Sequence, residues 1–179
     1  MHFEVLVEDL SGKRMLEGLL PKILGQKHTA RIINYSGVGR IQKALHKQPD
    51  PQKRHLLNHL PRLLRGYGKA LSSMPQDYAV LVVCDLDNRC FHDFRNALLD
   101  ILHQCDPQPK TRFCVAIEEG EAWLLGDIAA IKAAYPRAKD SILRGYKNDS
   151  ICGTWEVLAN AVYAGGAAAL LKSNYMAIG

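Results

Sequence analysis

The chain has 179 residues, of which 47% are hydrophobic. That is enough for one domain with a continuous core, but a second full domain would be cramped. The net charge of +5 and the pI near 9.0 suit an anionic partner such as nucleic acid, although many ordinary proteins share them. Five cysteines without CxxC spacing indicate reduced thiols, and exclude a disulfide framework or a zinc site. The acids Glu4, Glu8 and Asp9 interrupt the N-terminus, and no segment approaches the roughly 20 apolar residues that span a bilayer. We therefore expect a cytoplasmic protein without a signal peptide and with no membrane partner.

The N-terminal part of the chain predicts a strand, a helix and a second strand. Residues 3–8 form a short apolar run typical of a strand. Residues 9–24 predict a helix that Pro21 kinks or breaks, because apolar residues recur there at helical spacing. Residues 30–36 predict the second strand, which the glycine-rich turn GVGR follows.

The middle of the chain leads to the clearest strand. We expect a helix over residues 40–46, a turn at QPDPQ, and a helical stretch over 53–73 that Pro61, Gly66 and Gly68 interrupt. Residues 77–85 are apolar on both faces, as a central strand of a parallel sheet must be.

The C-terminal half adds one more strand and several helices. Residues 91–104 predict an amphipathic helix, 111–117 a strand, and 119–135 a single helix. Residues 138–153 read as loop, and 154–172 as a weaker helical segment. Strands that alternate with helices predict an α/β fold with a mostly parallel four-stranded sheet and helices on both faces. We assign residues 1–136 to this core and 137–179 to a helical C-terminal appendage of the same domain.

Acidic residues follow three of the four predicted strands. In an open parallel sheet, functional groups collect just beyond the carboxyl ends of the strands. Several carboxylates there would repel one another unless a cation neutralised them, and hard oxygen ligands favour Mg²⁺ or Mn²⁺. Such an ion could polarise a phosphoryl oxygen and activate a water molecule. The acids concerned are Glu8, Asp85, Asp87, Glu118, Glu119 and Glu121.

Each group of acids also has a structural interpretation. A DxD sequence at a strand end can be a turn, and Asp87 with Asn88 could cap the helix that begins near Phe91. The acids after the fourth predicted strand could be first-turn residues that a helix dipole favours. The convergence of three strand ends favours the metal site over these alternatives.

Four strings occur in order along the chain: VEDLSG, RLLRGYGKAL, VLVVCDLDNR, and AIEEGEAWLLGD followed by AAYP. A strand that ends in Glu before a small-residue loop and a helix, and a later strand that ends in DxD, resembles the Toprim domain. That domain occurs in topoisomerases, primases and the overcoming-lysogenization-defect nucleases. The whole set, which spans about residues 3–136, is most similar to a group of small standalone bacterial Toprim-like proteins. The resemblance implies a Rossmann-like Toprim fold.

The resemblance also implies roles for the acids. Glu8 matches the Toprim glutamate, which serves as general acid/base or assists metal binding, and Asp85 and Asp87 match the metal-coordinating pair. These three are the candidate catalytic residues. Glu119 and Glu121 are similar to the extra acids of the standalone group, and complete the candidate ligands for Mg²⁺ or Mn²⁺.

The sequence departs from the nuclease version of the motif in one loop. Asp9 stands where that version has glycine, and Gly12 and Lys13 stand where it has an acid.

Basic residues are concentrated in one stretch. Residues 40–69 hold eight Lys or Arg residues and one acid, which suits a phosphate backbone, although a solvated helical face is the common alternative. Tyr67 within it could stack on a base or pack against the sheet. The turn over residues 36–40 could cradle a phosphate at a helix N-terminus. The candidate phosphate-binding residues are Lys13, Arg40, Arg62, Arg65, Lys69 and Arg89.

We expect a metal-dependent nuclease or other phosphodiester hydrolase that acts on nucleic acid. The resemblance implies a bacterial setting in defence or DNA repair, beside an ATPase partner protein. The first alternative is a non-catalytic subunit that binds nucleic acid or a partner. The second is a haloacid-dehalogenase-like phosphatase with Asp85 as nucleophile, but DLDNR lacks the usual threonine and lies mid-chain.

Overall fold

A computed structural model describes residues 1–41, 54–74 and 77–172 of the chain. The chain divides into two compact units. The first lies within Met1–Cys84 and Arg89–Val115, and the second consists of Asp85–Asn88 together with the chain from Ala116 onward. Most of the sheet belongs to the first unit, and the helices that follow the last strand belong to the second.

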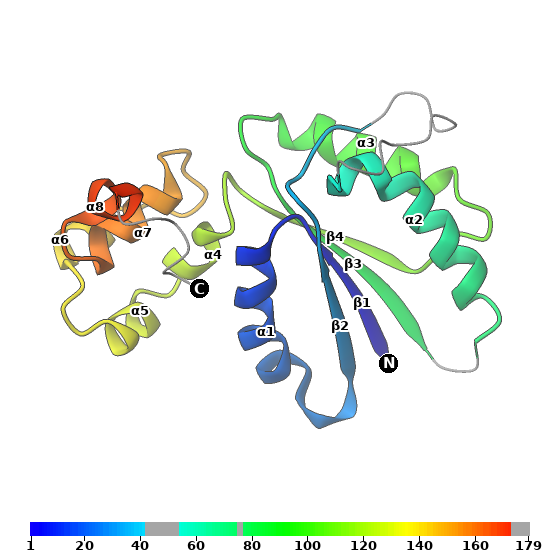
Figure 1. Cartoon of the computed structure of the whole chain (residues 1–179), viewed down its shortest axis with the longest axis horizontal. Helices are drawn as coiled ribbons and strands as arrows, with labels where there is room; N and C mark the ends of the chain where they lie inside the picture. The colour runs from blue at the N-terminus through cyan, green and yellow to red at the C-terminus, as the bar shows by residue number, and fades with distance from the viewer. Residues whose placement is uncertain (42–53, 75–76, 173–179) are drawn as a thin grey trace. The chain divides into compact units, whose positions relative to one another are not determined.

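The sheet has four strands in the order β2-β1-β3-β4, all parallel (Figure 1). Val7 pairs with Asn34 on one side and with Val83 on the other, so the strands end at a common edge. This arrangement confirms the predicted α/β fold and is consistent with Toprim-like or Rossmann-like folds. The strands are β1 (His2–Val7), β2 (Thr29–Asn34), β3 (Tyr78–Asp85) and β4 (Thr111–Ala116).

Helix α1 (Leu10–Leu24) covers one face of the sheet, and the short 3₁₀ helix η1 (Gly25–Lys27) follows it (Figure 1). Its buried Leu16 and Leu20 pack against alternate residues of β1 and β3, as the period of a strand requires. The predicted break at Pro21 is wrong. Pro21 and Glu17 are both exposed, so water can reach the carbonyl that proline leaves without a donor.

Helices α2 (Leu56–Leu71) and α3 (Phe91–His103) cover the other face (Figure 1). The predicted interruption of α2 is also wrong, because the helix continues through Pro61, Gly66 and Gly68. Four leucines of α2 are at most 1% exposed, and their burial outweighs the poor helix propensity of these residues. They are Leu56, Leu57, Leu60 and Leu64.

The second unit is helical. Its apolar cluster joins Leu125, Ile131, Leu143 and Ala161, so the helices next to β4 pack with the later ones. The sequence predicts a core over residues 1–136, whereas the division into compact units places the residues from Ala116 onward with the later helices. The helices are α4 (Glu121–Leu125), α5 (Ile128–Ala134), α6 (Asp140–Leu143), α7 (Thr154–Val162) and α8 (Gly166–Lys172).

Two predictions for this region are wrong. The single helix expected over residues 119–135 is two helices, because Asp127 caps α5 by accepting the Ala130 N–H at 2.9 Å. The expected loop over 138–153 contains the one-turn helix α6.

Other predictions depend on which residues are described. The helix expected over 40–46 and the QPDPQ turn lie mostly outside the described residues, and Arg40 and Ile41 are not helical. All five cysteines are free, as expected. Within the described ranges, no helix combines the length and apolar character needed to cross a bilayer.

Candidate functional site

The loops that follow β3 and β4 are hydrogen-bonded to each other. The Leu86 N–H donates to the Ala116 carbonyl at 2.9 Å, and the Asp87 N–H donates to the Glu118 carbonyl at 3.0 Å. Asp87 and Glu118 both have left-handed backbones, with φ of 50° and 65°. This conformation costs a non-glycine residue about 1 kcal/mol or more. The two acidic loops are therefore held together in strained conformations.

The DxD pair lies at the end of the central strand β3. Asp85 is the last residue of β3 and is half-buried, whereas Asp87 is exposed. Cys90 occupies the N-cap position of α3, so neither aspartate is the cap residue of that helix. The expected place of Asp87 as the N-cap residue of α3 is thus taken by Cys90.

Glu118 and Glu119 contact the N-terminus of α7, far along the chain. Glu118 accepts backbone N–H groups through both carboxylate oxygens, from Gly153 at 2.8 Å, Thr154 at 2.9 Å and Cys152 at 3.2 Å. Glu119 Oε2 accepts from the Trp155 N–H at 2.8 Å and the Thr154 hydroxyl at 3.0 Å. Such N–H groups have no partner within the helix, and the helix dipole favours negative charge beside them.

These contacts change the interpretation of both acids. Glu118 and Glu119 stabilise the start of a distant helix. The expected first-turn acid of the helix that follows β4 is Glu121. The carboxylate of Glu119 already has hydrogen-bond donors, and its role as a metal ligand stays a prediction.

The charge of Glu118 is stabilised by the same donors. Burial raises the pKa of this carboxyl group, but the N–H groups of Gly153, Cys152 and Thr154 lower it by more. The resulting pKa lies below the ordinary value, so Glu118 is ionised at neutral pH.

The donor set limits the kind of metal site. In the part of the chain that the structure describes, no three His, Cys, Asp or Glu side chains group closely enough to hold a metal ion. Mg²⁺ is commonly held by one or two carboxylates, with waters and substrate phosphate completing its octahedron. Asp85 and Asp87 could supply two such carboxylates, and their role as ligands stays a prediction. Glu121 begins α4 and is half-buried, and its role as a metal ligand also stays a prediction.

Glu8 and Asp9 follow the end of β1. Glu8 is half-buried, and its backbone carbonyl accepts the Gly37 N–H at 2.6 Å. Asp9 caps α1 by accepting the Gly12 N–H at 2.7 Å. A Cβ on Gly12 would lie 2.7 Å from Val7 Cγ2, which explains why no acid stands at this position.

The glycine-rich turn after β2 caps α2. The Leu56 N–H donates to the Gly37 carbonyl at 3.0 Å, and the Leu57 N–H donates to the Val38 carbonyl at 2.8 Å. Within the turn itself, the Ser36 N–H donates to the Arg54 carbonyl at 2.9 Å. The helix expected to follow the turn lies mostly outside the described residues, so phosphate binding by this turn stays a prediction. Arg40 continues this contact, because its backbone N–H donates to Asn58 Oδ1 at 2.8 Å, and its side chain is exposed.

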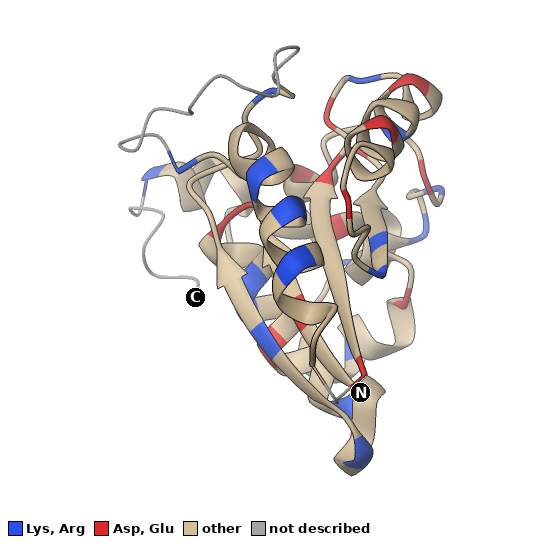
Figure 2. Cartoon of the chain, turned by 90° about the vertical axis from the view of Figure 1, so that its right-hand side faces the viewer, with Lys and Arg blue, Asp and Glu red and all other residues tan. Residues whose placement is uncertain are grey.

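Three predicted phosphate-binding residues lie on α2, which carries basic and no acidic residues (Figure 2). Arg62 and Lys69 are exposed, and Arg65 Nε donates to the Pro61 carbonyl at 3.1 Å. The structure thus groups these three on successive turns of one helix.

The other two candidates make local contacts. Lys13 pairs with Glu17 on α1 at 3.7 Å. The Arg89 guanidinium lies 5.0 Å from the ring centroid of Phe94 on α3.

An open groove of about 450 Å³ follows one side of α2. Its residues recur at intervals of three and four, so they form a single stripe on the helix. In the part of the chain that the structure describes, a Cβ on Gly66 would meet no atom within 4 Å. The lining residues are His59, Arg62, Leu63, Gly66, Tyr67 and Ala70.

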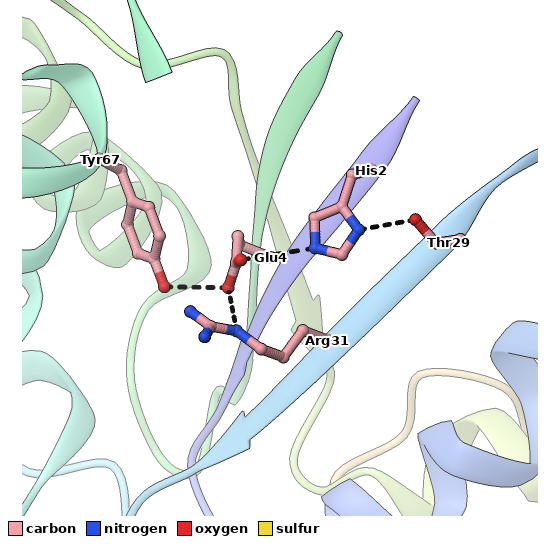
Figure 3. Close-up of polar contacts among 5 residues, drawn as sticks. All are labelled: His2, Glu4, Thr29, Arg31 and Tyr67. Atoms are coloured by element: carbon pink, nitrogen blue, oxygen red, sulfur yellow. Dashed lines mark hydrogen bonds and ion pairs between the residues drawn. The ribbon is translucent and has the colours of Figure 1, made fainter. Parts of the chain in front are cut away.

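The sequence interpretation missed a polar network that includes Tyr67 of this groove (Figure 3). Glu4 is only 7% exposed, yet its Oε2 accepts from Arg31 Nε at 2.9 Å and from the Tyr67 hydroxyl at 3.2 Å. His2 Nε2 lies 3.4 Å from the other oxygen. Burial and then the charge of Glu4 raise the pKa of Tyr67 to about 12, so its hydroxyl keeps its proton. The sequence does hold one indication of this network, because Glu4 is a charged residue within an otherwise apolar strand, and such a residue is rarely buried unless it is paired.

A scan against models of known protein families found no match, and searches of curated proteins and of solved structures found none. The Toprim resemblance therefore rests on the sequence motifs, and the fold is consistent with it.

Proposed function

We propose that this protein carries out divalent-metal-dependent phosphodiester hydrolysis on nucleic acid, as a Toprim-like nuclease. The observation that carries the proposal is the pair Asp85 and Asp87 at the carboxyl end of the central strand β3. Their loop is hydrogen-bonded to a second acidic loop and held in a strained conformation. Strained backbone of this kind concentrates at functional sites.

Asp85 and Asp87 would hold one Mg²⁺ or Mn²⁺ ion, with waters and a substrate phosphate as its remaining ligands. The bound ion supplies Lewis-acid polarisation of the phosphoryl oxygen and a more acidic water molecule. Without a cation, the two aspartates repel a phosphate, which makes activity dependent on the metal. The role of Glu8 as general acid/base follows from the Toprim resemblance.

The nucleic acid would meet the basic side chains of α2, which can neutralise its phosphate charge. The bacterial setting, in defence or DNA repair beside an ATPase partner, is part of the same proposal and comes from the resemblance.

Two measurements on one pair of proteins test the proposal. Calorimetry with Mn²⁺ and Mg²⁺, and cleavage of plasmid and oligonucleotides, compare the wild type with Asp85→Asn/Asp87→Asn. We expect the wild type to bind metal and cleave, and the double variant to lose metal binding and roughly 100-fold or more of the cleavage rate. The matched control is Asp93→Asn/Asp100→Asn, which removes two exposed aspartates of α3 and should change neither.

Other results would contradict the proposal in distinct ways. Metal binding without cleavage would favour the non-catalytic subunit. If no metal bound at millimolar concentration, the aspartates would have a structural role only.

A further inference from the structure

The α2 groove combines cationic and apolar groups on one stripe. Arg62 supplies the positive charge, and His59 lies one turn before it. Leu63, Tyr67 and Ala70 supply apolar or aromatic surface. The nearby buried carboxylate of Glu4 is paired with Arg31, so it does not oppose an anion there. The groove therefore offers positive charge beside an aromatic ring, which is the combination that binds unpaired nucleotides.

Gly66 keeps this groove open at a cost to the helix. Glycine is unfavourable in a helix interior, and among the described residues a Cβ at this position would meet no atom within 4 Å. The contrast is Gly68, where a Cβ would collide with the Pro107 carbonyl oxygen. Internal packing explains the glycine at 68 but not the one at 66, which is suited to the close approach of a ligand.

The ring of Tyr67 is positioned before any ligand arrives. Its hydroxyl donates to Glu4, which Arg31 and His2 also contact (Figure 3). An aromatic side chain held in this way loses little freedom on binding, which strengthens stacking. A base can stack on it only if it is not enclosed in a duplex.

From these observations we infer that the α2 groove binds single-stranded nucleic acid, with a base against Tyr67 and the backbone phosphate at Arg62 and His59. The inference rests on the proposed function, for which it names the strandedness of the substrate and the surface that holds it.

The test fills the groove without weakening the helix. Gly66→Gln introduces a long, neutral side chain with good helix propensity. The matched control is Gly18→Gln on α1, because Gly18 is also exposed and its Cβ would also meet no atom within 4 Å. Fluorescence anisotropy with labelled single-stranded DNA and RNA, in EDTA to prevent turnover, gives the dissociation constants.

We expect Gly66→Gln to weaken binding about tenfold and Gly18→Gln to leave it unchanged, while neither lowers the melting temperature. Arg62→Gln should weaken binding and reduce the slope of log K against log salt concentration by about 0.7. Tyr67→Phe keeps the ring but removes the hydroxyl that positions it, and should weaken binding by about two- to threefold, less than Gly66→Gln does. The comparison of the two dissociation constants shows whether the groove prefers single-stranded DNA or single-stranded RNA.

Three results would overturn the inference: binding of neither polymer, equal effects of the two glycine variants, or a duplex that competes as well as a single strand. The proposed function fails separately. A wild type that binds the oligonucleotide in EDTA, and loses that binding with Gly66→Gln, but neither binds Mn²⁺ or Mg²⁺ nor cleaves would contradict the metal site and leave the groove supported.

Discussion

Individual carboxylates in this protein differ in what neutralises their charge. Glu118 accepts backbone N–H groups at the start of α7. Glu4 accepts from side chains of β2 and α2, and Asp9 accepts an N–H of α1. The metal proposal depends on Asp85 and Asp87, which lie at the end of β3. Neither the residue type nor its position in the sequence predicts which groups contact each carboxylate.

Replacement of Glu118 by Gln should destabilise the second unit by about 1 kcal/mol, because one amide oxygen cannot accept what two carboxylate oxygens accept. The pKa of Glu118 is lowered in the folded state, so its stabilising effect is complete above about pH 5 and is lost as pH falls through the lowered pKa. Urea denaturation from pH 7 to pH 3 measures both effects. The control Glu17→Gln, at an exposed ion pair, should change little. A difference between wild type and Glu118→Gln that grew in acid would contradict the assignment.

Tyr67→Phe should lower the free energy of unfolding by about 1 kcal/mol, because buried Glu4 loses one hydrogen-bond donor. Chemical denaturation measures the loss. Tyr163→Phe, at an exposed tyrosine, is the control and should have no effect. Equal stability of the two variants would show that the Tyr67 hydroxyl contributes nothing to the fold.

At the level of elements, α2 shows how packing overrides local preference. Proline and two glycines predict a broken segment, yet the helix is continuous because its leucine face is buried. After β4, in contrast, the sequence predicts one continuous helix over residues 119–135, but Asp127 caps α5 and divides the run into two helices. Element types were therefore more predictable than element ends.

Two glycines of α2 should respond to alanine in opposite ways. Gly66→Ala should raise the free energy of unfolding by roughly 1 kcal/mol, since the added methyl group meets open space. Gly68→Ala should lower it by about 1–3 kcal/mol, since the added methyl group meets the Pro107 backbone. Guanidinium denaturation of both variants distinguishes them, and a change of the same sign in both would contradict the close approach at Gly68.

For the whole molecule, the division into two units predicts separate responses to core mutations. Leu143 is 1% exposed in the cluster of the second unit, and Leu143→Ala should destabilise that unit by about 2–5 kcal/mol. Hydrogen exchange should rise in α4 to α7 and stay unchanged in β1 and β3. Leu16→Ala, in the cluster between α1 and the sheet, is the reciprocal control. Uniform exchange in either variant would show that the units unfold together.

The sequence by itself determined the four strands, their parallel arrangement and the helices α1 and α3. These features follow from hydrophobic periodicity over a few residues, which neighbouring positions specify. It also placed acids at the strand ends, because a strand boundary is a local feature.

Only the tertiary structure decided which groups contact Glu4 and Glu118. Glu118 contacts a residue 35 positions away, and Glu4 contacts Tyr67 at a separation of 63. Such contacts form when the folded chain brings distant segments together, and no periodic pattern records them. The continuity of α2 has the same cause, because its stability comes from burial against the rest of its unit and not from its own residues.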